Sequence, residues 1–153
     1  MDQYPKLFIK TSLVYLIIGV SFGVGISFNP VIKTQFSFAH IHINLLGFMV
    51  MMIAGVSYHV LPRFASRQIP WPNGVKLHFY LHNLGLLGLV GTSLAGYRDT
   101  ILFILFSGLT AVSIMIMFYN LFFIFFSLSN GSKELNGNHP HPNCQEDCCP
   151  NSK

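Results

Sequence analysis

The stretch FAHIHINLLGFMVMMIAGVSYHVLPRF, from Phe38 to Phe64, decides the fold class of this chain. Most of it is apolar, and it is longer than the roughly 20 residues that a helix needs to cross the hydrocarbon core of a membrane. Two histidines, His40 and His42, stand near its start. A neutral imidazole in such surroundings needs a partner, which is a hydrogen-bonding group, another polar helix or a metal. The segment therefore bears on both fold and function.

The composition of the whole chain favours a membrane protein of one domain. Of the 153 residues, 52% are apolar and only 9% are charged, whereas soluble domains carry about a quarter charged residues. The net charge is +4, but the nine Lys and Arg residues are spread thinly along the chain. Because no basic patch is formed, we expect no nucleic-acid partner.

Four segments are long and apolar enough to span a membrane, at residues 7–28, 39–62, 75–97 and 100–128. The first resembles a signal peptide, but its apolar run is too long and no small-residue cleavage site follows, so we predict a retained span. Short links make neighbouring helices antiparallel. We predict an all-α, integral membrane four-helix bundle over residues 1–128, and a disordered polar tail over residues 129–153.

The positive charges predict the orientation of the bundle. Lys33 and Arg98 fall on one side of the four spans, and a larger group falls on the other side: Lys6, Lys10, Arg63, Arg67, Lys76 and Lys133. We therefore expect a multi-pass protein of the cell inner membrane with both termini in the cytoplasm. His40 and His42 then lie near the outer end of the second span, and the other histidines of the spans lie toward the inner side.

Helix geometry limits which histidines can share a ligand. His42 and His59 are 17 residues apart, which is roughly 25 Å along a helix axis and too far for one metal ion. His40 and His42 point about 200° apart around the same helix. This divergence is poorly suited to chelating one metal and suits a helix that lies between two cofactors.

The same residues resemble the tenth and eleventh helices of the catalytic subunit of haem-copper oxidases and nitric oxide reductases. The matching elements are the pair His40-Ile-His42, the interior Gly55, the turn His59-Val-Leu-Pro62, and the helix start Lys76-Leu-His78-Phe79. The loop GTSLAGYRDT resembles the one before the last helix of that family, so the resemblance covers residues 36–128, its C-terminal third. It implies that His42 ligates a low-spin haem b, and that His40 ligates a second haem iron.

The chain also departs from that family. The copper site of the family takes histidines from two other helices, and its low-spin haem takes a second ligand from an early helix, and these helices are missing here. The resemblance therefore does not extend to reduction of oxygen or nitric oxide by one chain. In a twofold homodimer His42 meets its own copy and can complete a haem site. A homotrimer, which imitates the family's three arcs of four helices, is the alternative.

The resulting hypothesis is a membrane haem b protein in a respiratory context. It passes electrons between the quinone pool or a redox protein and an acceptor, or it binds a diatomic gas such as oxygen or nitric oxide. Arg98, on the outer side, is a candidate partner for a haem propionate because its planar guanidinium suits carboxylates. His59 and His78 correspond to inner-end residues of the family helices.

Two further groups of residues suggest other metals. His78 and His82 lie at positions i and i+4 on one helix face, and together with His59 they form a candidate copper, zinc or second haem site. Capping and hydrogen bonding to the loop RQIPWPN is the favoured alternative for them. The tail holds a candidate zinc or copper(I) site, without zinc-finger spacing: His139, His141, Cys144, Cys148 and Cys149.

These groups support a second functional hypothesis, a copper-handling or assembly factor for a respiratory oxidase. A third is an accessory subunit without a cofactor, docked on a larger oxidase. The glycines of the spans, including Gly19, Gly23, Gly85 and Gly91, are predicted mainly to let helices pack closely.

Overall fold

The structure is a computed structural model, and it describes residues 3–28, 33–64 and 69–137. This part of the chain is almost wholly helical and contains no strand. Three stretches are long and apolar enough to cross a membrane, Gln3–Phe28, Phe36–Phe64 and Ile101–Phe126. The prediction of an all-α protein with membrane-spanning character is confirmed at this level. The tail from residue 138 onward, with its predicted metal site, lies outside the described residues.

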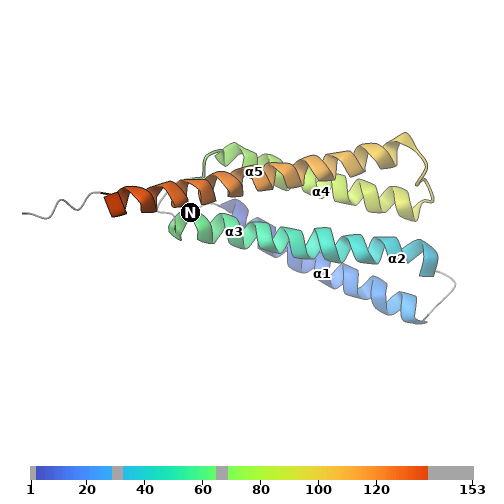
Figure 1. Ribbon diagram of the computed structural model, residues 1–153. Coiled ribbons are helices and arrows are strands. Elements are labelled where there is room, and N and C mark those ends of the chain that lie inside the picture. Colours follow the sequence, from blue (N-terminus) through green and yellow to red (C-terminus); the bar gives the residue numbers. More distant parts are fainter. Residues whose placement is uncertain (1–2, 29–32, 65–68, 138–153) are drawn as a thin grey trace, which may run out of the picture.

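The helices form two antiparallel pairs that lie side by side (Figure 1). In the first pair, α1 (Gln3–Phe28) packs against a continuous series made of α2 (Lys33–His42), η2 (Ile43–Val50) and α3 (Met51–Phe64). In the second pair, α4 (Pro72–Leu94) packs against α5 (Ile101–Gly137). Contacts within each pair are more extensive than contacts between the pairs. The start of α1 and the far end of α5 lie at the same end of the bundle.

The second span is interrupted by a π-helix. Residues 43–50, directly after His42, form η2, while α2 and α3 on either side are ordinary α-helix. In a π-helix each N–H bonds the carbonyl five residues back, and such segments are rare and mostly a single turn long. The sequence did not predict this change of helix type, which begins next to the proposed haem ligand.

A glycine-dependent cap ends α4 and reverses the chain. Gly96 has a φ of 82°, in the left-handed region where only glycine is at ease. The N–H of Tyr97 donates to the Thr92 carbonyl at 2.9 Å, and the N–H of Gly96 donates to the Ser93 carbonyl at 3.2 Å. This pair of bonds is a Schellman motif. The motif reverses the chain, so that α5 runs back along α4. Arg98, which follows Tyr97, therefore lies at the end of the bundle.

The helix boundaries differ from the prediction at two places. Helix α5 continues to Gly137 rather than ending at 128. Helix α4 is not among the three stretches apolar enough to span a membrane. Its polar side chains are instead directed into the bundle, where His78, His82 and Ser93 are buried.

Close helix packing at glycines is confirmed for some positions and not for others. At Gly85 of α4, an added Cβ would lie 2.8 Å from the backbone nitrogen of Thr110 in α5. At Gly91 of the same helix, an added Cβ would meet nothing within 4 Å. The two glycines therefore form a useful pair on one helix: Gly85 is buried against α5, and Gly91 is exposed.

We expect Gly85→Ala to lower the stability of the bundle, because the backbone of α5 must move to make room for the methyl group. Overpacking of this kind costs about 1–3 kcal/mol. Gly91→Ala should be neutral or stabilising by up to about 1 kcal/mol, since alanine is the better helix former. Unfolding in detergent micelles, followed by circular dichroism, measures both. Equal effects of the two substitutions would contradict the proposed close approach at Gly85.

Candidate functional site

His40 faces α1 and is fixed by hydrogen bonds. Its Nδ1 lies 2.8 Å from the carbonyl oxygen of Gly19. Because a carbonyl only accepts, Nδ1 carries the hydrogen and Nε2 keeps its lone pair. Gly23 makes room for the ring, since a Cβ there would lie 2.7 Å from His40 Cε1. Asn44 adds a bond from its Nδ2 to the His40 carbonyl at 2.9 Å.

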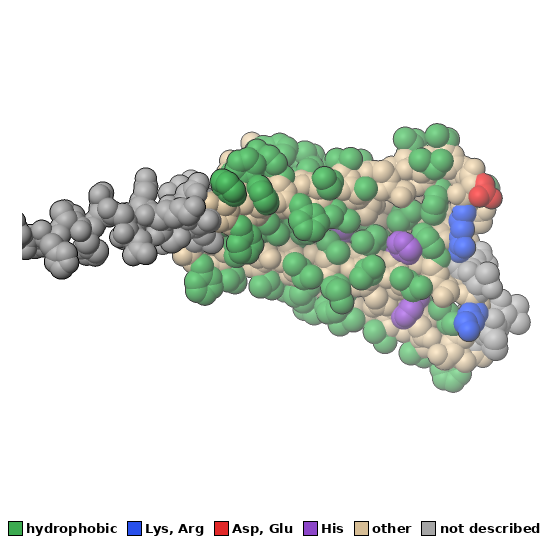
Figure 2. Space-filling model, in the orientation of Figure 1, with side chains coloured by type: hydrophobic (Ala, Val, Ile, Leu, Met, Phe, Trp, Pro, Cys, Tyr) green, Lys and Arg blue, Asp and Glu red, His purple; other side chains and the backbone are tan. Residues whose placement is uncertain are grey.

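His42 has the same tautomer but faces the other helix pair. Its Nδ1 lies 2.9 Å from the Phe38 carbonyl, so Nε2 again holds the lone pair. The ring stacks on the Phe38 ring at 3.8 Å between centroids, and Phe38 in turn contacts Phe103 of α5 at 5.7 Å. The divergence of His40 and His42 that the helical spacing predicts is therefore confirmed. Both rings stay partly exposed, and histidine atoms show among apolar side chains in Figure 2.

Arg98 lies beside the same aromatic ring. Its guanidinium carbon is 5.1 Å from the centroid of Phe38, a distance at which a cation interacts favourably with a ring. The Nε of Arg98 donates to Ser93 Oγ at 2.9 Å. The structure thus brings His42 and Arg98 together around Phe38, at the end of the bundle where the Gly96 turn lies.

His78 and His82 lie in the interior of the bundle and not at its edge. Both are fully buried, and their ring centroids are 5.5 Å apart. His78 Nδ1 and Tyr58 Oη form a hydrogen bond of 3.2 Å. The Nε2 of His82 lies 3.1 Å from the Leu46 carbonyl, to which it donates. The sequence favours capping and bonding to the loop RQIPWPN for these two residues. In the structure they bond to other helices instead.

Helix α4 supplies the polar contacts that join the two helix pairs. Besides the bonds of His78 to Tyr58 and of His82 to Leu46, Tyr15 of α1 donates to Asn83 Oδ1 at 2.8 Å. All three bonds cross from the first pair to α4. The lower apolarity of α4 is explained by these inward-facing side chains, which apolar residues could not replace without loss of the bonds.

Two polar residues of α5, Ser113 and Asn120, were not among the predicted site residues. Ser113 Oγ lies 2.9 Å from His82 Nδ1, and Asn120 is completely buried. Within the described residues, both side-chain polar atoms of Asn120 and the Nε2 of His78 make no bond of good hydrogen-bond geometry, although Asn120 lies near the Tyr58 hydroxyl. The signal was available for Asn120, which is the one asparagine in the apolar run 101–126, because a polar group inside a spanning helix is costly.

The other predicted metal ligands are not gathered by this structure. Among the described residues, no group of three His, Cys, Asp or Glu side chains is placed to hold a metal ion. His59, partly exposed near the end of α3, therefore does not join His78 and His82 in one ligand set. The tail ligands His139, His141, Cys144, Cys148 and Cys149 lie outside the described residues.

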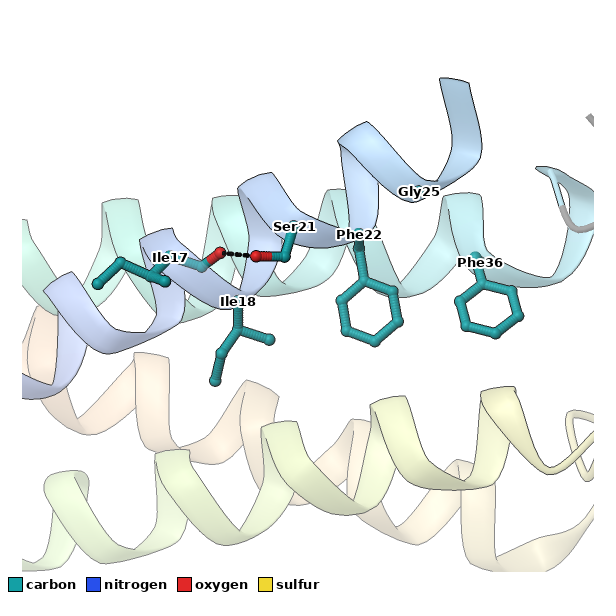
Figure 3. Close-up of a pocket in the computed structure, with 6 residues that line it drawn as sticks. All are labelled: Ile17, Ile18, Ser21, Phe22, Gly25 and Phe36. Carbon is teal, nitrogen blue, oxygen red and sulfur yellow. Dashed lines mark hydrogen bonds between the residues drawn. The ribbon is translucent and has the colours of Figure 1, made fainter. Parts of the chain in front are cut away.

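An apolar cavity of about 350 Å³ opens between α1 and α2 (Figure 3). Ile18 and Phe22 point from α1 toward the second helix pair, as Phe36 does from α2. The hydroxyl of Ser21 donates to the Ile17 carbonyl at 2.8 Å, so its hydrogen is already used. Gly25 completes the lining. The cavity holds no metal ligand, and its walls suit hydrocarbon.

Comparison of the chain with protein-family models, with curated proteins and with solved structures found no match. The resemblance to haem-copper oxidases therefore rests on the motif residues themselves.

Because the buried polar atoms of Asn120 make no bond of good hydrogen-bond geometry, we expect Asn120→Leu to stabilise the bundle. An unpartnered buried polar group costs about 1–3 kcal/mol, and an apolar side chain of similar size avoids this cost. Ser113→Ala should act in the opposite direction by about 1 kcal/mol, since it removes the partner of His82. Denaturation in micelles compares the two variants. Destabilisation by Asn120→Leu would show that Asn120 has a partner.

Proposed function

We propose that this chain is a multi-pass inner-membrane protein that binds haem b through His42, works as an oligomer and transfers electrons. The observation that carries the proposal is the hydrogen bond from His42 Nδ1 to the Phe38 carbonyl. Metal-ligating histidines almost always donate their second ring N–H in this way, which fixes the tautomer and the ring direction. The Nε2 lone pair of a partly exposed ring is then available to iron.

Four spans with cytoplasmic termini fit this proposal. Helix α4 has 23 residues, about 35 Å of helix, which is enough to cross the hydrocarbon core beside α5. The end of the bundle that holds the start of α1 also holds the end of α3 and the start of α4. Among the side chains that the structure describes, the cations toward this end are Lys6, Lys10, Arg63 and Lys76. Their excess over Lys33 and Arg98 supports a cytoplasmic position by the positive-inside rule.

A second histidine to hold the haem would come from another copy of the chain. Among the described residues, the other histidine near the level of His42 is His40, and its ring is directed to α1 by its bond to Gly19. A twofold axis beside α2 would bring His42 opposite its own copy, because symmetry pairs identical residues. We favour this dimer over a trimer. His40 remains a candidate ligand for a second haem, on the α1 side.

Arg98 supports a haem whose propionates face the outer end. Its guanidinium lies against Phe38, the ring on which His42 stacks. A planar guanidinium binds carboxylates through two parallel hydrogen bonds. The proposed iron ligand, His42, and the proposed propionate partner, Arg98, therefore both contact the ring of Phe38.

The ligand set favours electron transfer over gas chemistry. Bound haem would supply one-electron chemistry, and His42 with the His42 of a second copy would hold it. The protein would tune the potential through the Phe38 carbonyl, the nearby cation and burial in the membrane. The partners that suit such a site are a membrane quinone and a redox protein at the outer face. Five-coordinate ligation by one histidine would instead permit binding of oxygen or nitric oxide.

We expect the purified protein to show a b-type reduced-minus-oxidised spectrum, and His42→Ala to abolish it. His59→Ala is the control, because His59 lies near the far end of α3 and should leave the spectrum unchanged. Haem retained in the His42 variant would overturn the assignment. A colourless protein that carries copper or zinc, and that loses it when residues 139–149 are deleted, would support the metal-handling alternative. A colourless protein that purifies with a larger oxidase would support the accessory subunit.

Native mass spectrometry from nanodiscs tests the shared site. A His42–His42 haem requires two chains for each haem, and His42→Ala should remove the haem from the assembly without unfolding either chain. A monomeric chain that still holds a six-coordinate haem would contradict the shared ligation.

A further inference from the structure

Two side-chain hydrogen bonds to backbone carbonyls are made at the π-helix η2, one near its start and one within it. Near its start, Asn44 Nδ2 donates to the His40 carbonyl at 2.9 Å. Within it, His82 Nε2 donates to the Leu46 carbonyl at 3.1 Å. Side chains that insert into the backbone hydrogen-bond ladder are a recognised cause of helix distortion. The Leu46 bond is the more informative of the two, because it comes from a different helix pair.

His82 is well placed to hold η2 in this form. Its ring is completely buried, and Ser113 Oγ of α5 lies 2.9 Å from Nδ1. Because Nε2 donates to Leu46, Nδ1 accepts from the Ser113 hydroxyl, whose hydrogen is shared with the Thr110 carbonyl at 2.6 Å. In the absence of water, the Leu46 carbonyl and the His82 N–H would each lose a partner if η2 moved away. The contact therefore stabilises the wider π-turns against the ordinary α-helix, which closes its bonds within one helix.

The helix type of η2 determines the direction of His42. This residue directly precedes η2, and the helices on the two sides of η2, α2 and α3, are both packed against α1. If residues 43–50 adopted α-helical turns, α2 would rotate about its axis relative to α3. Each extra residue that a π-turn holds, compared with an α-turn, corresponds to a rotation on the order of 100°. His42 would then leave the face on which Phe38 contacts Phe103.

We infer that His82 is a positioning residue for His42: its hydrogen bond to the Leu46 carbonyl maintains η2, and η2 directs the imidazole of His42 to the face of α2 beside α5. The part of this inference that concerns haem ligation rests on the proposed function. The part that concerns the direction of α2 does not depend on haem.

His78 provides the matched control for His82. The two histidines are one turn apart on α4, and both are completely buried. His78 bonds the side chain of Tyr58 and not a backbone carbonyl of η2. A substitution at either position removes a buried imidazole, but only a substitution at His82 releases Leu46. General destabilisation should therefore affect both variants, whereas rotation of α2 should appear in one.

The rotation can be measured with two spin labels in the full-length chain, with the tail cysteines replaced by serine. Ile41 of α2 and Leu105 of α5 are both exposed and accept the labels without disturbing the core. We expect His82→Leu to change the label distance by up to about 8 Å, the chord of a 100° turn at the radius of helix side chains. His82→Gln, whose amide can still donate to Leu46, should restore the original distance, and His78→Leu should leave it unchanged.

The same variants are examined by electron paramagnetic resonance of the oxidised haem, whose g values report the orientation of the axial imidazoles. His82→Leu should shift these values or lose the haem, and His82→Gln should retain them. An unchanged label distance in His82→Leu, or an equal change in His78→Leu, would overturn the inference. If His82→Leu does not fold, His82→Asn replaces it, because the shorter amide does not reach Leu46. Wild-type protein without haem would overturn the proposed function, while the label distances still test the role of His82.

Discussion

In the hydrocarbon core of a membrane, an imidazole N–H has no water to bond and must reach an oxygen of the protein. Three histidines of this chain meet that requirement with backbone carbonyls: His40 with Gly19, His42 with Phe38 and His82 with Leu46. In each case the bond also fixes the ring and decides which nitrogen keeps its lone pair. The orientation of the proposed ligands, and the shape of the helix that carries them, both depend on this one constraint.

Much of the fold follows from local sequence. The apolar lengths predict the helices, and the spacing of His40 and His42 predicts that they face opposite sides, as the contacts with Gly19 and with Phe38 confirm. The predicted role of Gly23 in close packing is also explained, because the ring of His40 occupies the space that a side chain would fill. The helices and the divergence of the two histidines depend on local helical periodicity, whereas the Gly23 contact also needs α1 and α2 to pack together.

The features that the sequence analysis missed depend on residues far apart in the chain. The π-helix at residues 43–50 is bonded by His82, 36 residues beyond Leu46, so no local pattern around Gly47 could predict it. The interior position of His78 depends on Tyr58 and on the ring of Phe8. Helical periodicity likewise could not show that α4, which is not among the three stretches apolar enough to span a membrane, directs polar groups inward.

The division into two helix pairs bears on how the chain is assembled in the membrane. Each pair can form first as an independent hairpin, in keeping with its more extensive internal contacts. Until the hairpins meet, Tyr15, the Leu46 carbonyl and His82 lack the partners that they have in the finished bundle. Lipid cannot supply these partners, so a hairpin that stays alone is left with unsatisfied polar groups. Contact between the two hairpins would therefore be favoured over leaving either one alone in the lipid.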